Sequence, residues 1–219
     1  MKQCRTARWL WGVLVVLAVA AASAAWAVEA GVEKAKQTEE IGMLVPYVPT
    51  PPQVVDVMLD MADLKSTDVV FDLGCGDGRI VVAAAKRGAR AYGVDIDPAR
   101  VKEANENAKQ AGVADKVTIM LNDVFKTDFS SATVVTMYLL PEYNRRLRPI
   151  LARTLPVGAR VVSHDFDMPG WQAVETRKVE KEYGTATVYL WKITPEMKKA
   201  RKPAGEGQTG ARKKKAAVQ

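Results

Sequence analysis

Residues 69–86 read as a strand, a glycine-rich turn and a helix in direct succession, and this order constrains the fold most. The β-branched and aromatic run Val69–Phe71 is typical of a buried strand, and Asp72 follows it. The turn places glycine at every second position, including Gly74 and Gly76, before the helical pattern RIVVAAAKR begins. A strand that enters a helix through such a turn indicates an open α/β sheet, which binds ligands at the carboxyl ends of its strands.

The chemistry of the turn narrows the class of ligand. Glycine leaves the backbone bare for close approach, and the helix start offers unpaired N–H groups to an anion. The spacing G-x-G-x-G differs from the G-x-G-x-x-G of dinucleotide-binding turns, because Arg79 stands where the third glycine would be. The carboxylate of Asp72 would repel a pyrophosphate but suits a cationic amino group. The turn therefore favours a ligand with a positive charge, and a glycine turn without a ligand is the alternative.

The motif D-L-G-C-G-D-G-R at residues 72–79 resembles the first motif of class I S-adenosylmethionine-dependent methyltransferases. This resemblance implies an α/β fold with a Rossmann-like, seven-stranded sheet of order 3-2-1-4-5-7-6 and helices on both faces. Only the last strand of the chain would be antiparallel. It also implies S-adenosyl-L-methionine as the cofactor and no metal ion.

Acidic residues follow the next two expected strands. The strand Arg90–Ile96 carries Asp95 near its end, where an acid accepts both ribose hydroxyls of a nucleotide. The strand Lys116–Leu121 precedes Asp123, which by resemblance binds the exocyclic amine of adenine. Either aspartate could instead be a solvated turn residue. The implied cofactor-binding residues are Thr50, Asp72, Gly74, Gly76, Asp95, Ile96, Asp123 and Val124.

Prolines punctuate the chain on both sides of the motif. Their density in residues 46–52 precludes a regular strand or helix interior, so the chain is extended there. We expect Thr50 to cap a helix over Pro52–Leu64; a lid over the cofactor, formed with Tyr47, is the alternative. A later helix begins at Pro141 and contains Pro149, which predicts a kink or two short helices.

The other expected elements follow from periodicity and turn residues. They are a helix begun by Asp97 and Pro98 and ending at Gly112, strands at Ala132–Leu140 and Arg160–Phe166, and a hairpin of Ala173–Glu180 with Thr185–Ile193.

The net charge of +7 is unevenly distributed. Residues 1–27 carry +3 and residues 195–219 carry +6, so the part between them carries −2. The slightly acidic charge of residues 28–194 does not favour nucleic-acid binding. Residues 46–194 form the expected methyltransferase domain. Residues 28–45 read as a polar connector and 195–219 as a basic, disordered tail.

The first 27 residues have the pattern of a targeting segment. Basic residues precede an uncharged run over residues 9–28, and Ala25-Trp26-Ala27 resembles a signal-peptide cleavage site. We expect either a signal peptide cut after Ala27 or an uncleaved membrane anchor. Both place the body outside the cytoplasm, in the cell envelope. An anchor that faces the cytoplasm is the alternative, because S-adenosylmethionine is made and held there.

A narrower resemblance rests on P-Y-V-P-T-P at residues 46–51, the glycine motif, and G-A-R-V-V-S at residues 158–163. Together these resemble the small lysine methyltransferases of the ATP synthase c-subunit and adenine nucleotide translocase, and related bacterial proteins. The resemblance implies a protein lysine as methyl acceptor. Together with the hydrophobic N-terminal segment, it leads us to expect a membrane-associated protein as the substrate. We expect the enzyme to be a monomer.

Candidate catalytic residues follow the fourth and fifth expected strands, where the methyl group would lie. They are Tyr138, His164 and Asp165, with Glu142 nearby. His164 is the only histidine, and a structural role in hydrogen bonding is its alternative. Two other functions stay open: an exported module that keeps the fold and a nucleoside-binding cavity without turnover, and methylation of RNA or a small molecule.

Overall fold

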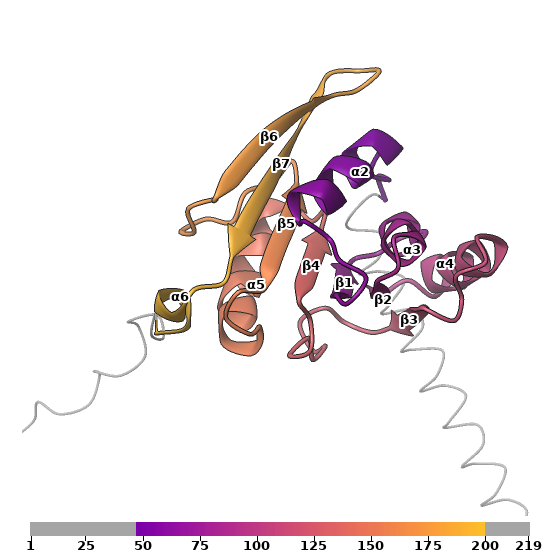
Figure 1. Ribbon diagram of the computed structural model, residues 1–219, viewed down its shortest axis with the longest axis horizontal. Coiled ribbons are helices and arrows are strands. Elements are labelled where there is room, and N and C mark those ends of the chain that lie inside the picture. The colour runs from indigo at the N-terminus through magenta and orange to yellow at the C-terminus, as the bar shows by residue number, and fades with distance from the viewer. Residues whose placement is uncertain (1–46, 200–219) are drawn as a thin grey trace, which may run out of the picture.

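Seven strands form one sheet in the order β3-β2-β1-β4-β5-β7-β6, which confirms the topology expected from the resemblance. The computed structural model describes residues 47–199, and Figure 1 shows the sheet with its helices around it. The strands are β1 (Val69–Leu73), β2 (Arg90–Asp95), β3 (Val117–Leu121), β4 (Val134–Met137), β5 (Arg160–His164), β6 (Glu175–Glu180) and β7 (Thr185–Lys192).

The pairing of the strands places the carboxyl ends of β1 to β5 at one edge of the sheet. β1 pairs in parallel with β2 and β4, and β4 pairs in parallel with β5. β7 runs antiparallel to both β5 and β6, as expected for the last strand of the chain. The β6–β7 hairpin projects from the sheet, at the top of Figure 1.

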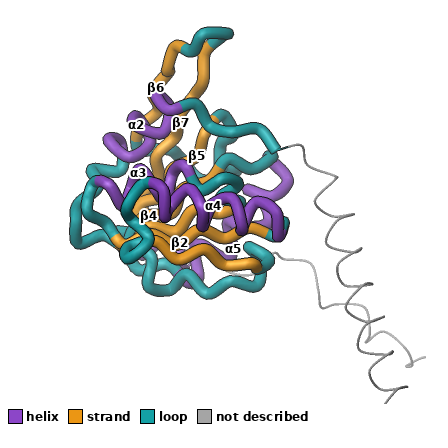
Figure 2. Tube along the Cα trace, turned by 90° about the vertical axis from the view of Figure 1, so that its right-hand side faces the viewer, coloured by secondary structure: helices purple, strands orange, loops and turns teal. Residues whose placement is uncertain are grey.

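Helices cover both faces of the sheet (Figures 1 and 2). Within residues 47–199 they are α2 (Pro52–Met61), α3 (Arg79–Lys86), α4 (Pro98–Gln110), α5 (Pro141–Thr154) and α6 (Pro195–Lys199). Alternate residues of a strand point to opposite faces. Val70 accordingly joins the core under α2 and α3, whereas Phe71 and Leu73 join the core under α5.

The structure corrects two expectations about local structure, one of them in part. Thr50 does not cap α2, because its neighbour Pro51 occupies the N-cap position and the Thr50 side chain is buried against His164. Of the two alternatives expected at Pro149, two short helices are excluded, because α5 is one helix from Pro141 to Thr154. Pro149 lies on the exposed side of α5, where the carbonyl that loses its hydrogen bond can face water.

The expectation of a disordered tail is wrong at its first residues, which form α6. Lys198 donates its ammonium to the backbone carbonyls of Arg153 and Leu155 at the end of α5. Met197 packs against the core under α5. The predicted targeting segment, the connector over residues 28–45 and the rest of the tail lie outside the described residues. Among residues 47–199, no helix is long and apolar enough to cross a membrane.

Candidate functional site

A cavity of about 400 Å³ opens at the carboxyl edge of the sheet, above β1, β2 and β4. Seven of the eight predicted cofactor residues line it, and so does one predicted catalytic residue. The lining residues among them are Thr50, Asp72, Gly74, Asp95, Ile96, Asp123, Val124 and Tyr138. Gly76, His164 and Asp165 do not line the cavity.

The end of β2 presents Asp95 to the cavity in a fixed orientation. The backbone N–H of Gly76 donates to Asp95 Oδ2 at 2.8 Å, and that of Asp97 donates to Oδ1 at 3.0 Å. Each carboxylate oxygen therefore keeps lone-pair capacity toward the cavity. Asp97 also caps α4 by accepting from the N–H of Ala99, as the sequence predicts.

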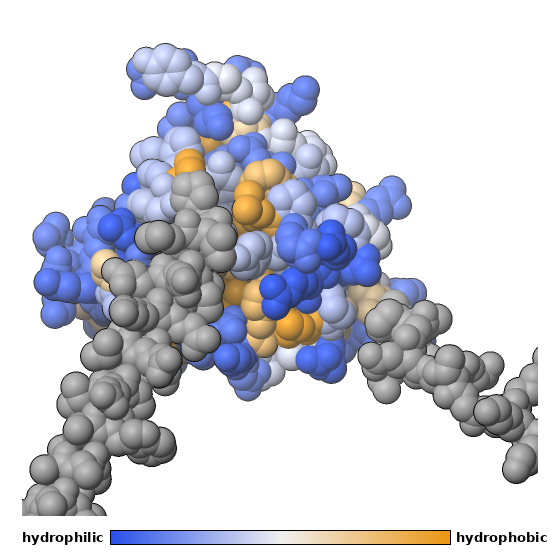
Figure 3. All heavy atoms as spheres, turned by 180° about the vertical axis from the view of Figure 1, so that it is seen from behind, coloured by the Kyte–Doolittle hydropathy of each residue, from blue (hydrophilic) through white to orange (hydrophobic). Residues whose placement is uncertain are grey.

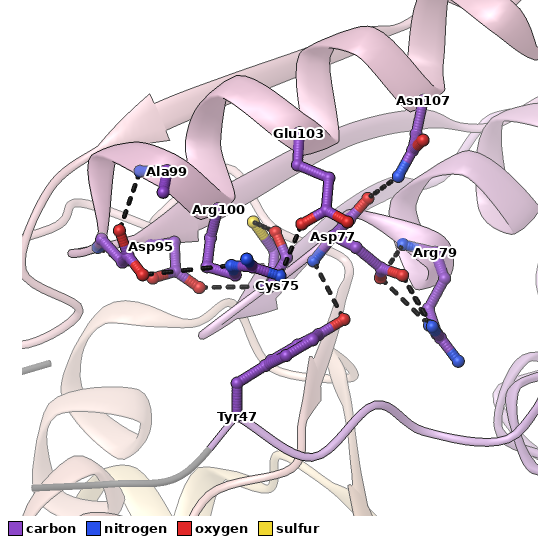
Figure 4. A network of polar contacts seen from close by, with 11 residues as sticks. Tyr47, Cys75, Asp77, Arg79, Asp95, Ala99, Arg100, Glu103 and Asn107 are labelled. Atoms are coloured by element: carbon purple, nitrogen blue, oxygen red, sulfur yellow. Dashed lines mark hydrogen bonds and ion pairs between the residues drawn. The ribbon is translucent and has the colours of Figure 1, made fainter. Parts of the chain in front are cut away.

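Tyr47 packs directly over the glycine turn (Figure 4). A Cβ at Gly76 would overlap the Tyr47 ring, and Gly76 has a φ of +54°, which disfavours any other residue. The Tyr47 hydroxyl accepts from the N–H of Asp77 at 3.4 Å, and the guanidinium of Arg100 stacks on the ring 4.8 Å from its centroid. The absence of a side chain at Gly76 therefore makes room for the Tyr47 ring as well as for a ligand.

Arg79 joins the turn to the segment before α2. It binds the carboxylate of Asp77 through two nitrogens and donates from Nη1 to the Thr50 carbonyl at 2.9 Å. Burial raises the pKa of the Asp77 carboxyl, but the hydrogen bonds from Arg79 outweigh it and hold that pKa below its usual range. The ion pair thus fixes residues 47–50 as one wall of the cavity.

Asp72 is a fully buried acid without a cation beside it among the described residues. Burial raises the pKa of its carboxyl to about 7, and the nearby charges of Asp95 and Asp77 act in the same direction. A hydrogen bond from Thr136 Oγ1, 2.7 Å long, opposes this effect in part. A positive charge placed in the cavity would stabilise the ionised form.

The opposite end of the cavity is closed by Asp123 and an aromatic pair. Asp123 Oδ1 accepts from the N–H of Phe125 at 2.9 Å. Phe125 stacks on Tyr143, with ring centroids 5.9 Å apart, and the guanidinium of Arg146 lies 3.9 Å from the Phe125 centroid. This end offers a carboxylate and flat apolar surfaces to a planar, amine-bearing ring.

The three predicted catalytic residues meet at the ends of β4 and β5. The Tyr138 and His164 rings lie against each other, with centroids 3.9 Å apart. His164 is buried, and its Nδ1 lies 3.1 Å from Thr50 Oγ1, whose residue is 114 positions earlier in the chain. Burial lowers the pKa of His164 to about 4, so the imidazole is neutral at pH 7.

Asp165 lies beside His164 and has an unusual backbone conformation. Its φ of +59° is unusual for a residue with a side chain, and bonds to the backbone of Thr187 on β7 hold it there. Its Oδ2 lies 3.3 Å from His164 Nε2, which has no hydrogen-bond partner among the described residues. Burial raises the pKa of the Tyr138 hydroxyl, and the charge of Asp165 adds to this shift.

Sequence reasoning missed Phe125 and Arg146 as parts of the cavity, and nothing in their spacing marks them. It placed Arg79 in the glycine motif but did not foresee its contacts with Asp77 and Thr50. It also missed Asn144, although a signal existed. Asn144 shares the buried face of α5 with Leu147 and Leu151, so it is a polar residue at a core position. Glu142 is exposed, pairs with Arg145 and does not line the cavity.

A protein-family model matches the chain around this cavity. The ANTKMT methyltransferase domain matches residues 72–175, which extend from Asp72 to the first residue of β6. Within residues 47–199, no cluster of three or more His, Cys, Asp or Glu side chains is arranged to hold a metal ion.

Two curated relatives carry specific names. The protein-lysine N-methyltransferase of Saccharolobus islandicus is 47% identical over 151 residues, which cover 68% of this chain and 94% of the relative. The adenine nucleotide translocase lysine N-methyltransferase of Mus musculus is 38% identical over 131 residues, or 59% of this chain and 57% of the relative. The chain thus spans little more than half of the mouse enzyme.

A solved structure is also similar. The RNA methyltransferase of Salinibacter ruber in complex with S-adenosyl-L-homocysteine is 51% identical, with a TM-score of 0.63. The similarity covers 74% of this chain and all of that chain.

Proposed function

This chain belongs to the S-adenosylmethionine-dependent methyltransferases of the ANTKMT type, and we propose that its methyl acceptor is the side-chain amine of a protein lysine. The observation that carries the proposal is the 47% identity to a protein-lysine N-methyltransferase over 94% of that enzyme's length.

The chemistry of the cavity fits S-adenosylmethionine. Asp95, oriented by two backbone N–H groups, would accept both ribose hydroxyls. Asp123 would accept from the adenine amine, beside the Phe125–Tyr143 pair. Asp72, whose pKa burial raises to about 7, would take the amino group of the methionine moiety, because that cation compensates its charge.

The acceptor would enter beside Tyr138. The cofactor supplies an electrophilic methyl group, so the protein must hold a neutral amine in line with it, about 3 Å away, and exclude water. Tyr138 lines the cavity, so its hydroxyl would bind the amine. Asp165 and His164 do not line the cavity. The charge of Asp165 acts on the Tyr138 hydroxyl and would favour a lysine ammonium beside it, and His164 stacks on the Tyr138 ring and would position it.

The location of the target is a further part of the proposal. The uncharged run of residues 9–28 supports an enzyme held at a membrane, in the cell envelope or facing the cytoplasm. A membrane-held enzyme meets membrane-held substrates at high effective concentration. Relatives named as lysine methyltransferases of the ATP synthase c-subunit and of adenine nucleotide translocase support the same class of substrate.

RNA is the second candidate acceptor, favoured by the name of the Salinibacter structure. Residues 46–194 carry no net positive charge, which weighs against RNA because nucleic-acid binding relies on basic surfaces. Seen from behind, the described surface is mostly hydrophilic with a few apolar residues gathered near its centre (Figure 3).

One experiment separates the acceptors. The protein is incubated with methyl-labelled S-adenosylmethionine and a cell extract, and label is measured in membrane protein, soluble protein, RNA and small-molecule fractions. Hydrolysis of the protein fraction should release the label as methyllysine. Asp95→Ala serves as the control for transfer that depends on the cavity. Label found only in RNA or small molecules would overturn the lysine assignment while leaving the methyltransferase intact.

A further inference from the structure

Asn144 is a buried amide at a core position of α5. Its exposed fraction is 0%, and it shares one helix face with Leu147 and Leu151. Its Oδ1 is buried without a hydrogen-bond partner among residues 47–199. A buried amide with an unsatisfied oxygen costs stability relative to an apolar residue, so its presence calls for a physical reason.

The reason lies in the loop that follows β5. Asn144 Nδ2 donates to the backbone carbonyls of Phe166 at 3.2 Å and Asp167 at 3.0 Å. These two residues directly follow Asp165, whose positive φ is strained. The amide therefore holds the backbone that keeps the Asp165 conformation in place.

The same side chain also links this loop to the segment after β4. α5 begins at Pro141, three residues after Tyr138, and Asn144 lies in its first turn. Tyr138 and His164 lie at the ends of adjacent strands, and His164 points toward Thr50, whereas α5 packs on the other face of the sheet. Asn144 does not line the cavity, and its side chain affects Asp165 only through the backbone carbonyls of the two residues that follow.

We propose that Asn144 is a positioning residue for methyl transfer, whose amide clamps the loop after β5 so that Asp165 stays beside Tyr138 and His164. The inference rests on the proposed roles of Tyr138 and Asp165 on the acceptor side. Its own evidence is the pair of hydrogen bonds to Phe166 and Asp167 and the strained backbone between them and β5.

The test uses Asn144→Leu, which removes the donor, and Asn144→Asp, which keeps the size of the side chain if the leucine variant does not fold. Methyl transfer to poly-L-lysine should lose about tenfold to a hundredfold in kcat, as expected when a reacting group is misplaced. The affinity for S-adenosylhomocysteine should stay unchanged, because no cofactor contact is altered. Thr133→Val is the matched control, since Thr133 ties Asp68 and Val69 at the opposite edge of the sheet. It should lower the Tm with kcat unchanged.

Two further measurements do not require turnover. Backbone amides of residues 165–168 should exchange hydrogen faster in the Asn144 variants and not in the control. The titration of the Tyr138 phenol, followed by absorbance against Tyr138→Phe, should move toward its ordinary pKa as Asp165 is released. A lower Tm with kcat, exchange and titration all unchanged would overturn the proposal. If the wild-type protein does not methylate poly-L-lysine, hydrogen exchange and the Tyr138 titration still decide the role of Asn144, and the fractionation of labelled acceptors decides the lysine proposal separately.

Discussion

Binding of S-adenosylhomocysteine should depend on pH through Asp72. Without a ligand, burial raises the pKa of this carboxyl to about 7, so it is half protonated at neutral pH. The ligand's amino group is positive and would lie against it, which favours the ionised form and lowers the pKa in the complex. The dissociation constant should then rise about tenfold from about pH 8 to about pH 6, which corresponds to a loss of about 1.4 kcal/mol in binding free energy.

Calorimetry in buffers of different ionisation enthalpy measures this effect directly. At neutral pH, binding should release about half a proton per site, because half of the carboxyls are protonated beforehand. Asp72→Asn removes the titrating group and keeps the size of the side chain, so its affinity should not change over the same range. An affinity of the wild-type protein that is independent of pH, with no proton released, would refute the assignment of Asp72 to the amino group.

Three other predictions concern single residues. Asp72 has a folded-state pKa raised from 3.8 to about 7, so its contribution to stability is complete below about pH 4 and is lost as pH rises through about 7. In urea unfolding, the free energy of unfolding of Asp72→Asn should therefore rise relative to that of the wild-type protein across this window, by up to about 4 kcal/mol. Asp95→Ala should weaken cofactor binding by about 1.5–3 kcal/mol in calorimetry, because a charged acceptor of two hydroxyls is lost, and equal affinities would exclude the ribose role. Gly76→Ala and Gly158→Ala both place a side chain at positive φ, but only the former meets a neighbour, the Tyr47 ring; both should lower the Tm, and only Gly76→Ala should weaken S-adenosylhomocysteine binding in a titration.

The sequence predicts the sheet well because its signals are local. Val69–Phe71 and Arg90–Ile96 are apolar runs bounded by glycine and acids, and the observed strands differ by a residue or two at their ends. Asp97 and Pro98 start α4 as expected, because a capping side chain and a fixed φ act within one turn. The strand order came from resemblance to a family.

The contacts that shape the site escape such reasoning because they join distant residues. Thr50 has the pattern of a helix cap, yet a histidine 114 positions later takes its hydroxyl. The Tyr47 ring over Gly76 and the Asn144 amide on the loop after β5 depend on tertiary packing as well. Acids at strand ends can be predicted from the sequence, because the topology brings those ends together. Partners that a helix face or an extended segment supplies cannot be predicted in this way.

The location of the transferable methyl group tests the proposed mechanism most directly. S-adenosylmethionine carrying a ¹³C-labelled methyl group is bound to the protein, and nuclear Overhauser effects from that methyl are recorded. We expect contacts to the ring protons of Tyr138, which lines the cavity at the end of β4, and their loss in Asp95→Ala at the same ligand concentration. Methyl contacts confined to residues beside Asp123, at the other end of the cavity, would contradict the mechanism.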